Sequence, residues 1–306
     1  MKQVSFTFLL FLPLLCYSQQ KPAADASELL INTTIKIQGQ FDTTINGKKK
    51  QLGTSGTGFF FEYDFEGKKF PVIVTNYHVI QNSTTGKIIF NLTDSEGRTL
   101  YGKKREINFS DFKSYWLRHP DNNIDLAILP IGLILNEHKK LGIRLAYLPL
   151  NENLIPNDSI VNTMRAIEDI YMIGYPFGKR DEYNNTPITR KGITATPFSL
   201  NYENKKEFLA DIPVYPGSSG SPIVIYNTAY ADKVGNMYQG LRIVFLGINY
   251  ATYSRNFEGR IVPKLSYEIN TNNIIVNTSI PYNLGIIIKS ETLLDFKPII
   301  DNKYFK

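Results

Sequence analysis

The sequence contains a single cysteine, and beyond its first twenty residues it contains no long apolar run. That cysteine, Cys16, lies near the start of the chain. A chain with one cysteine can form no internal disulfide, so its stability must come from a buried core. With 306 residues and 42% hydrophobic composition, the chain can build one two-lobed fold or two small domains. The lack of a long apolar run predicts no transmembrane segment.

Histidine is also scarce, with three residues in the whole chain. His119 and His138 lie among charged or polar neighbours, so we expect both at the surface. The histidine and carboxylate residues are scattered without the spacing of metal ligands, so we expect no metal and no cofactor. His78 differs from the other two because it ends an apolar, strand-like segment that begins at Pro71.

The first twenty residues are typical of an export signal. The apolar run 6–15 is too short to span a membrane, and the small residues Cys16 and Ser18 suit signal peptidase. We therefore expect residues 1–18 to be a signal peptide and the protein to be exported, either to the periplasm or out of the cell. The competing interpretation is a lipoprotein anchored on Cys16. It is disfavoured because the bulky Leu15 stands where a small residue is required.

Short strand-like segments separated by turn residues run through the rest of the chain. Residues 34–41 alternate between polar and apolar side chains, and Asn46 with Gly47 then gives a turn signal. Similar segments follow at 56–63 and 87–92. Many short strands with few helical stretches predict an all-β fold, either a sandwich or a barrel.

The segment 216–222, Pro-Gly-Ser-Ser-Gly-Ser-Pro, is the most informative stretch. Gly217 and Gly220 can adopt positive φ and turn backbone N–H groups toward one point beside the Ser219 hydroxyl. Such a point can hold an oxyanion. The same composition is typical of any surface turn between strands, so the segment alone does not establish a site.

Two further segments supply the partners that a nucleophilic serine needs. His78 ends one apolar strand, and Asp125 stands at the head of another. Acyl transfer by serine requires a base that accepts the hydroxyl proton and a carboxylate that orients the base. Asp121 is a nearby rival for the carboxylate, but it lies off the strand.

Ser218 and Ser221 compete with Ser219 for the role of nucleophile. Only Ser219 has a glycine two positions before it and another immediately after it. This spacing gives its own N–H and that of Gly217 a common target. We therefore interpret Ser218 and Ser221 as turn residues.

The order His78, Asp125, Ser219, with spacings of 47 and 94 residues, resembles the trypsin/chymotrypsin superfamily of serine proteases. Within it, the chain is similar to the bacterial branch that includes the glutamyl endopeptidases and the HtrA-type proteases. The resemblance covers roughly residues 33–290. The segments that carry it are Thr75-Asn76-Tyr77-His78-Val79, Asp125-Leu126-Ala127-Ile128, Gly174-Tyr175-Pro176, Lys191-Gly192-Ile193-Thr194, Gly217-Ser218-Ser219-Gly220-Ser221-Pro222 and Leu246-Gly247-Ile248-Asn249.

This resemblance implies a serine endopeptidase with two antiparallel six-stranded β-barrels in the chymotrypsin-like arrangement. After an N-terminal extension at 19–32, the first barrel would span 33–135, the inter-barrel crossing 136–162 and the second barrel 163–306. His78 and Asp125 would then lie on the first barrel and Ser219 on the second. Ser290 to Phe296 is expected to form a short C-terminal helix with Ser290 as its N-cap. Only ten residues follow it, so we expect no peptide-binding module of the HtrA kind there.

Departures from the family pattern bear on the substrate. The residue six before the serine, acidic in trypsin-like enzymes, is Pro213, which argues against a basic P1 residue. In the glutamyl endopeptidases a histidine and a threonine receive the glutamate side chain, and here those positions are Asn249 and Val214. We therefore expect apolar or small uncharged P1 residues. An extended substrate would pair with the main chain of the segment Gly247 to Thr252, which includes Asn249, Tyr250 and Ala251.

The residue before the nucleophile bears on activation. Digestive members of the superfamily have an aspartate there, which binds the newly cut N-terminus and forms the oxyanion hole. Ser218 occupies that position, and its hydroxyl supplies no counter-charge for a buried ammonium. We expect the site to need no trypsinogen-like cleavage.

Two other functions stay open at this point. A catalytically silent family member would act as a binding protein, and only geometry separates it from an active enzyme. The pI of 9.1, with the basic runs 48–50 and 103–105, suggests a polyanion binder. Those runs lie in expected turns, so solvated loops explain them better, and we expect protein or peptide substrates and no nucleic acid. The oligomeric state is not predicted.

Overall fold

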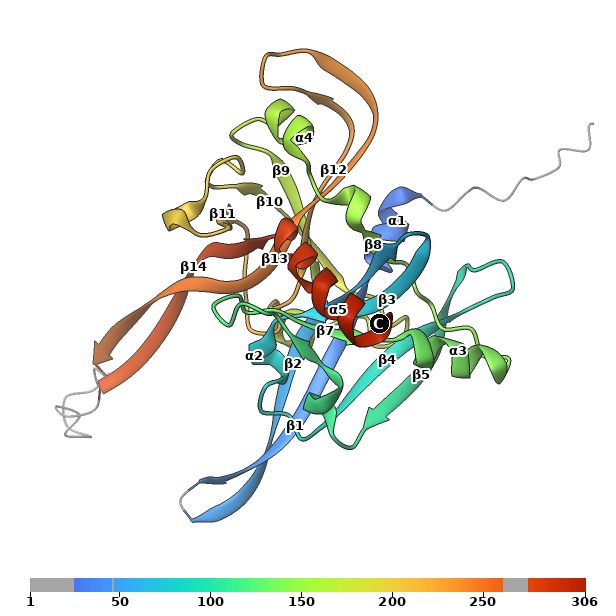
Figure 1. Cartoon of the computed structure of the whole chain (residues 1–306). Helices are drawn as coiled ribbons and strands as arrows, with labels where there is room; N and C mark the ends of the chain where they lie inside the picture. The colour runs from blue at the N-terminus through green and yellow to red at the C-terminus, as the bar shows by residue number, and fades with distance from the viewer. Residues whose placement is uncertain (1–24, 46, 261–274) are drawn as a thin grey trace, which may run out of the picture.

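The computed structural model describes residues 25–45, 47–260 and 275–306, and two β-sheets make up most of it (Figure 1). The expected signal peptide and Cys16 lie outside these residues. The first sheet contains β1 (Thr34–Ile45), β2 (Lys48–Phe65), β3 (Lys68–Thr75), β4 (Thr85–Thr93), β5 (Thr99–Phe109), β6 (Leu117–Arg118), β7 (Ala127–Pro130) and β8 (Leu150–Asn151). The second contains β9 (Asp169–Gly174), β10 (Ile188–Thr194), β11 (Glu207–Asp211), β12 (Pro222–Ala231), β13 (Met237–Arg260) and β14 (Ile275–Lys289).

The two sheets have different connectivity. The first runs in the order β5-β4-β1-β2-β3-β7-β6, and β8 adds to β2 in the parallel direction. The second closes as a six-stranded antiparallel barrel in the order β10-β11-β14-β13-β12-β9. The chymotrypsin-like, all-β prediction is confirmed. The first sheet, expected as a six-stranded barrel, is an eight-stranded sheet in which the two-residue strands β6 and β8 are the extra pair, and closure into a barrel is seen for the second sheet.

Helices are short and lie between or after the strands. The α-helices are α1 (Ala26–Ile31), α2 (Tyr77–Ile80), α3 (Gly132–Lys140), α4 (Asp158–Thr163) and α5 (Lys297–Tyr304). The 3-10 helices are η1 (Phe112–Tyr115), η2 (Glu152–Leu154), η3 (Pro176–Gly178), η4 (Tyr202–Asn204) and η5 (Ser290–Phe296). Within the described ranges, no helix has the length and apolar character needed to cross a membrane.

The C-terminal helix forms where it was expected, but its start differs from the prediction. Ser290 is not the N-cap, because that position belongs to Lys289. The Ser290 side chain is fully buried, and its hydroxyl donates to the main-chain oxygen of Phe245 at 2.7 Å. This partner on the adjacent strand β13 takes the place of the first-turn N–H groups that an N-cap would satisfy. The helical segment also continues past Phe296 into α5.

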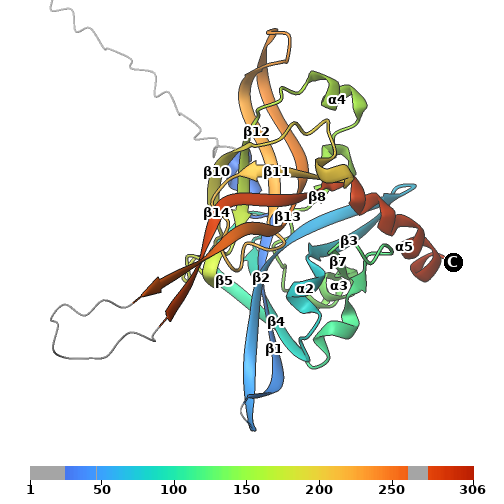
Figure 2. The same ribbon diagram turned by 90° about the vertical axis from the view of Figure 1, so that its left-hand side faces the viewer.

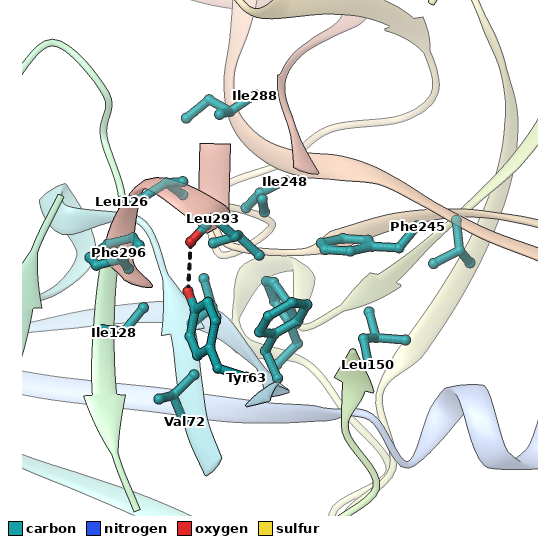
Figure 3. Close-up of a cluster of buried hydrophobic side chains, with 14 of the residues drawn as sticks. Tyr63, Val72, Leu126, Ile128, Leu150, Phe245, Ile248, Ile288, Leu293 and Phe296 are labelled. Atoms are coloured by element: carbon teal, nitrogen blue, oxygen red, sulfur yellow. Dashed lines mark hydrogen bonds between the residues drawn. The ribbon is translucent and has the colours of Figure 1, made fainter. Parts of the chain in front are cut away.

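One hydrophobic core joins the first sheet, the second barrel and the C-terminal segment (Figure 3). The rings of Phe59 and Phe245 meet edge to face, with centroids 5.3 Å apart. The hydroxyl of the buried Tyr63 donates to the main-chain oxygen of Leu293 at 3.0 Å. Burial raises the pKa of Tyr63, so the hydroxyl keeps its proton for this bond. The shared core fixes the loops of one sheet relative to those of the other.

Three long hairpins project from this body. The β1–β2 hairpin extends from the first sheet, and the β12–β13 and β13–β14 hairpins extend from the barrel in different directions (Figures 1 and 2). The strand predicted at 34–41 therefore continues to Ile45 and belongs to a longer hairpin.

His119 is buried, contrary to the prediction that it lies at the surface. Its side chain is 0% exposed, and its ring packs edge-on against Phe296. Nδ1 accepts the Asp121 N–H at 3.0 Å, so Nε2 carries the proton and donates to Thr292 O at 3.1 Å. Two backbone partners thus satisfy a ring that the polar neighbouring sequence suggested was solvated. His138 is half-buried on α3 and donates to Ile134 O.

Candidate active site

His78 and Asp125 form a pair at the end of the first sheet. His78 lies in α2, three residues after β3 ends at Thr75, and Asp125 lies two residues before β7. The Nδ1 atom of His78 is 2.5 Å from Oδ2 of Asp125. The His78 backbone N–H donates to the other carboxylate oxygen at 2.9 Å, and the Asn76 amide donates to Asp125 O at 2.9 Å. These bonds fix the carboxylate against Nδ1 and leave Nε2 for another partner. The imidazole side chain is 41% exposed, so a substrate can reach it.

The segment that carries Ser219 requires glycine at two positions. Gly217 and Gly220 have φ of +90° and +85°. An added Cβ at Gly220 would overlap the main-chain oxygen of Thr57, and one at Gly217 would lie 2.5 Å from Tyr175 O. Only glycine accommodates both the backbone conformation and the close approach.

Thr57 on β2 holds this segment against the first sheet. Its backbone N–H donates to Ser219 O at 2.9 Å, and its buried hydroxyl donates to Gly217 O at 2.9 Å. The same hydroxyl accepts the Tyr175 N–H at 3.0 Å. Thr75, three residues before His78, donates its hydroxyl to Thr57 O at 2.7 Å. Strand β3, which leads to His78, and its neighbour β2 therefore also hold the serine segment.

Sequence reasoning missed Thr57. The only sequence signal is its place between two glycines, Gly56 and Gly58, where neighbouring chains can approach closely. An added Cβ at Gly58 would meet Ile37 and Ile73, and one at Gly56 would meet Val79. Such tight packing is visible only in three dimensions.

The three serines of the segment differ in exposure. Ser218 and Ser221 are fully buried, whereas Ser219 is partly exposed. The Ser218 hydroxyl accepts from Arg190 at 3.0 Å and from the Tyr215 N–H at 3.3 Å. Ser219 is therefore the serine of this segment that a substrate can approach.

Thr57 and Thr75 link the serine segment to the strand that leads to His78, but His78 and Ser219 share no direct hydrogen bond within the described residues. Across the part of the chain that the structure describes, bonds join His78 to Asp125, but none joins the Ser219 hydroxyl to the imidazole. In enzymes without substrate, catalytic hydrogen bonds are often long and tighten when substrate binds. The rival Asp121 instead accepts the N–H and the side-chain amide of Asn123.

The N–H groups of Gly217 and Ser219 are the two that the sequence predicted for an oxyanion. Within the described residues, neither donates a hydrogen bond to another protein group. The Pro216 carbonyl accepts the Phe177 N–H at 2.5 Å. Because a trans peptide points its C=O and N–H in opposite directions, the Gly217 N–H points away from Phe177. Phe177 itself has a φ of +52°, a strained conformation for a residue other than glycine.

The expected substrate-binding residues separate into two groups. Val214 packs in the barrel core, and Gly247 lies within the β12–β13–β14 ladder. Contrary to expectation, Asn249 has no free main-chain group, because its N–H donates to Ser221 O at 3.0 Å and its oxygen accepts the Gly220 N–H at 2.8 Å. Its buried side-chain amide donates to Ser218 O at 3.2 Å.

Tyr250 and Ala251 lie beyond the last residue of β13 that pairs with β12, which is Ile248. Both side chains are half-buried. The Tyr250 hydroxyl donates to Glu207 at 3.0 Å, and burial together with this carboxylate raises the pKa of Tyr250. Pro213 is half-buried, and its carbonyl accepts from Arg190. Among the described residues, no group of three or more histidine, cysteine or carboxylate side chains could hold a metal ion.

A chymotrypsin-like pair of sheets, with a His–Asp pair on one sheet and a Gly-Ser-Ser-Gly turn on the other that is linked to it through Thr57 and Thr75, is typical of the class of trypsin-like serine proteases. The family model described as "Trypsin-like peptidase domain" matches residues 56–228, which is more than half of the chain. The chain therefore belongs to the trypsin-like peptidase family, and it is a serine endopeptidase by that membership.

Two solved structures are similar to this chain. Rv3671c from M. tuberculosis H37Rv, in an inactive form with serine replaced by alanine, has 13% sequence identity and a TM-score of 0.39. The match covers 92% of this chain and 98% of that one. The MamO protease domain from Magnetospirillum magneticum, in its apo form, has 11% identity and a TM-score of 0.38, with 84% and 93% of the two chains covered. No curated protein matches the chain.

The role of Thr57 can be tested with Thr57→Val, which keeps the shape of the side chain and removes its hydroxyl. The variant leaves the Tyr175 N–H and the Gly217 carbonyl without this partner, at a cost of about 1–3 kcal/mol for each buried group. We expect a lower free energy of unfolding in urea and slower reaction of Ser219 with a fluorophosphonate. Thr54→Val, on the same strand with a half-buried hydroxyl 3.1 Å from Ser83, is the matched control. Equal behaviour of the two variants would contradict the role of Thr57.

Proposed function

We propose that the protein is an exported serine endopeptidase that cleaves peptide bonds through an acyl-enzyme formed on Ser219. The observation that carries this proposal is the His78–Asp125 pair, which leaves Nε2 free in the region of a partly exposed serine. The hydrogen bonds of Thr57 and Thr75 support it, because they fasten the serine segment to the strand that leads to His78.

In the proposed mechanism, the Ser219 hydroxyl attacks the substrate carbonyl while Nε2 of His78 accepts its proton. Asp125 accepts the Nδ1–H and stabilises the resulting imidazolium. The developing oxyanion accepts hydrogen bonds from the N–H groups of Gly217 and Ser219. His78 then donates the proton to the leaving amine, and the peptide C–N bond breaks. A water molecule, deprotonated by His78, hydrolyses the acyl-enzyme and restores the serine.

Reaction with a fluorophosphonate tests whether the site is competent. We expect stoichiometric labelling of the wild type, loss of labelling in Ser219→Ala, and a fall of about 10⁴-fold in kcat for Asp125→Asn, which favours the wrong imidazole tautomer. Ser221→Ala is the matched control, because the buried Ser221 hydroxyl has no hydrogen-bond partner within the described structure. Intact mass spectrometry measures the adduct. A folded wild type that resists labelling would instead favour the catalytically silent binding protein.

We also propose a preference for uncharged P1 residues. Pro213 and Val214 carry no charge, and the Asn249 amide is committed to Ser218 O, so these positions offer no counter-charge to a charged P1 side chain. Profiling on a peptide library should give kcat/KM values for apolar or small uncharged P1 residues at least roughly tenfold above those for Arg, Lys or Glu. Strong preference for any charged P1 residue would contradict this proposal.

The proposed export is supported by the apolar run 6–15 and the small residues Cys16 and Ser18. We propose cleavage after Ser18, which leaves Gln19 as the first residue. N-terminal mass spectrometry of protein recovered from the native host should show Gln19 at the start. A chain that begins at Met1, or a lipid-modified Cys16, would contradict cleavage at this bond.

A further inference from the structure

Arg190 lies on strand β10 of the barrel and contacts the segment that precedes Ser219. Its side chain is half-buried, and among the described residues it forms no ion pair with a carboxylate. Burial lowers the pKa of Arg190, although a guanidinium stays protonated in proteins. A half-buried cation without a carboxylate is costly unless its N–H groups are used.

Both arms of the guanidinium contact the segment that precedes Ser219. Nη1 donates to the Pro213 carbonyl, and Nη2 donates to the Ser218 hydroxyl at 3.0 Å. These two acceptors stand at opposite ends of the segment 213–218. The planar fork of an arginine suits such a bridge, because its donors are fixed relative to each other.

Further contacts connect Arg190, through Tyr215 and Phe177, to the peptide that carries the Gly217 N–H. The guanidinium lies over the Tyr215 ring, 5.4 Å from its centroid, and Tyr215 stacks on Phe177 with centroids 5.0 Å apart. The Tyr215 backbone contacts Ser218 through both its N–H and its oxygen. The Phe177 N–H holds the Pro216 carbonyl, which determines where the Gly217 N–H points.

We infer that Arg190 is a positioning residue, which holds the segment 213–219 so that the N–H groups of Gly217 and Ser219 converge on one oxyanion. The inference rests on the proposed peptidase function. The inference also gives a physical reason for a serine at position 218. Digestive relatives have an aspartate there, which binds the cut N-terminus, whereas the neutral Ser218 hydroxyl accepts a hydrogen bond from the Arg190 guanidinium. An internal side chain thus does what a new N-terminus does in those enzymes, and the site forms without cleavage.

The experiment compares substitutions at Arg190 with a neighbour on the same strand. Arg190→Met keeps an apolar stem against Tyr215 and removes all donors, Arg190→Lys keeps the charge, and Arg190→Ala leaves a space for free guanidinium. Lys191→Met is the matched control, because the exposed Lys191 pairs with Asp169 and does not touch the segment. Each variant is measured for kcat, KM, fluorophosphonate labelling, circular dichroism and melting temperature.

Arg190→Met should lose about 10²–10³-fold in kcat, as when an oxyanion donor is removed, with KM little changed. Arg190→Lys should recover only part of this loss, because one ammonium cannot bridge both acceptors. Millimolar guanidinium chloride, far below denaturing concentrations, should restore activity to Arg190→Ala but not to Arg190→Met. Lys191→Met should match the wild type. A merely structural role for Arg190 would lower stability without guanidinium rescue.

The inference is overturned if Arg190→Met keeps the kcat of the wild type. It is also overturned if a folded Arg190→Ala loses activity that guanidinium does not restore. If Arg190→Met does not fold, the kcat of Arg190→Lys and the guanidinium rescue of Arg190→Ala test the inference instead. Failure of the proposed function is a separate result, because the wild type itself would then resist the fluorophosphonate.

Discussion

The structure depends on one buried set of hydrogen bonds between the Thr57 backbone and hydroxyl on the first sheet and the serine segment on the barrel. The sheets meet here through main-chain groups that are removed from water, so each lost bond would leave a buried polar group unpaired. Close contact excludes side chains, which explains why Gly174 and Gly220 carry none. The His78 end of β3 is held in the same network through Thr75.

The serine segment is held from three directions. Thr57 contacts it from the first sheet, the Asn249 side chain contacts it from β13, and Arg190 contacts it from β10. These bonds use the carbonyl groups and the Ser218 hydroxyl, and they leave the N–H groups of Gly217 and Ser219 for a ligand. In the proposed function these N–H groups bind the oxyanion, so the site is ready before any substrate arrives, which is how electrostatic catalysis avoids reorganisation during the reaction.

The sequence predicted the parts of the site that depend on local chemistry. The ordered segments around His78, Asp125 and Ser219 predicted the family, and the many short strand-like segments predicted the all-β fold. Contacts between residues that are far apart in the chain could not be predicted from the sequence. His119 has polar neighbours in the chain, yet it is buried by the C-terminal segment, and Ser290 bonds to the adjacent strand β13 instead of capping its helix. Thr57 and Arg190 look like ordinary strand residues, because their partners are far away in the chain.

A crystal structure with a peptidyl phosphonate bound tests the central claim most directly. We expect a covalent bond to the Ser219 oxygen, with a phosphonyl oxygen about 2.7–3.1 Å from the N–H groups of both Gly217 and Ser219. The Nε2 atom of His78 should lie within hydrogen-bond reach of the adduct, with Asp125 still on Nδ1. An adduct on another residue, or a phosphonyl oxygen that turns away from both N–H groups, would contradict the convergence of these residues in one active site.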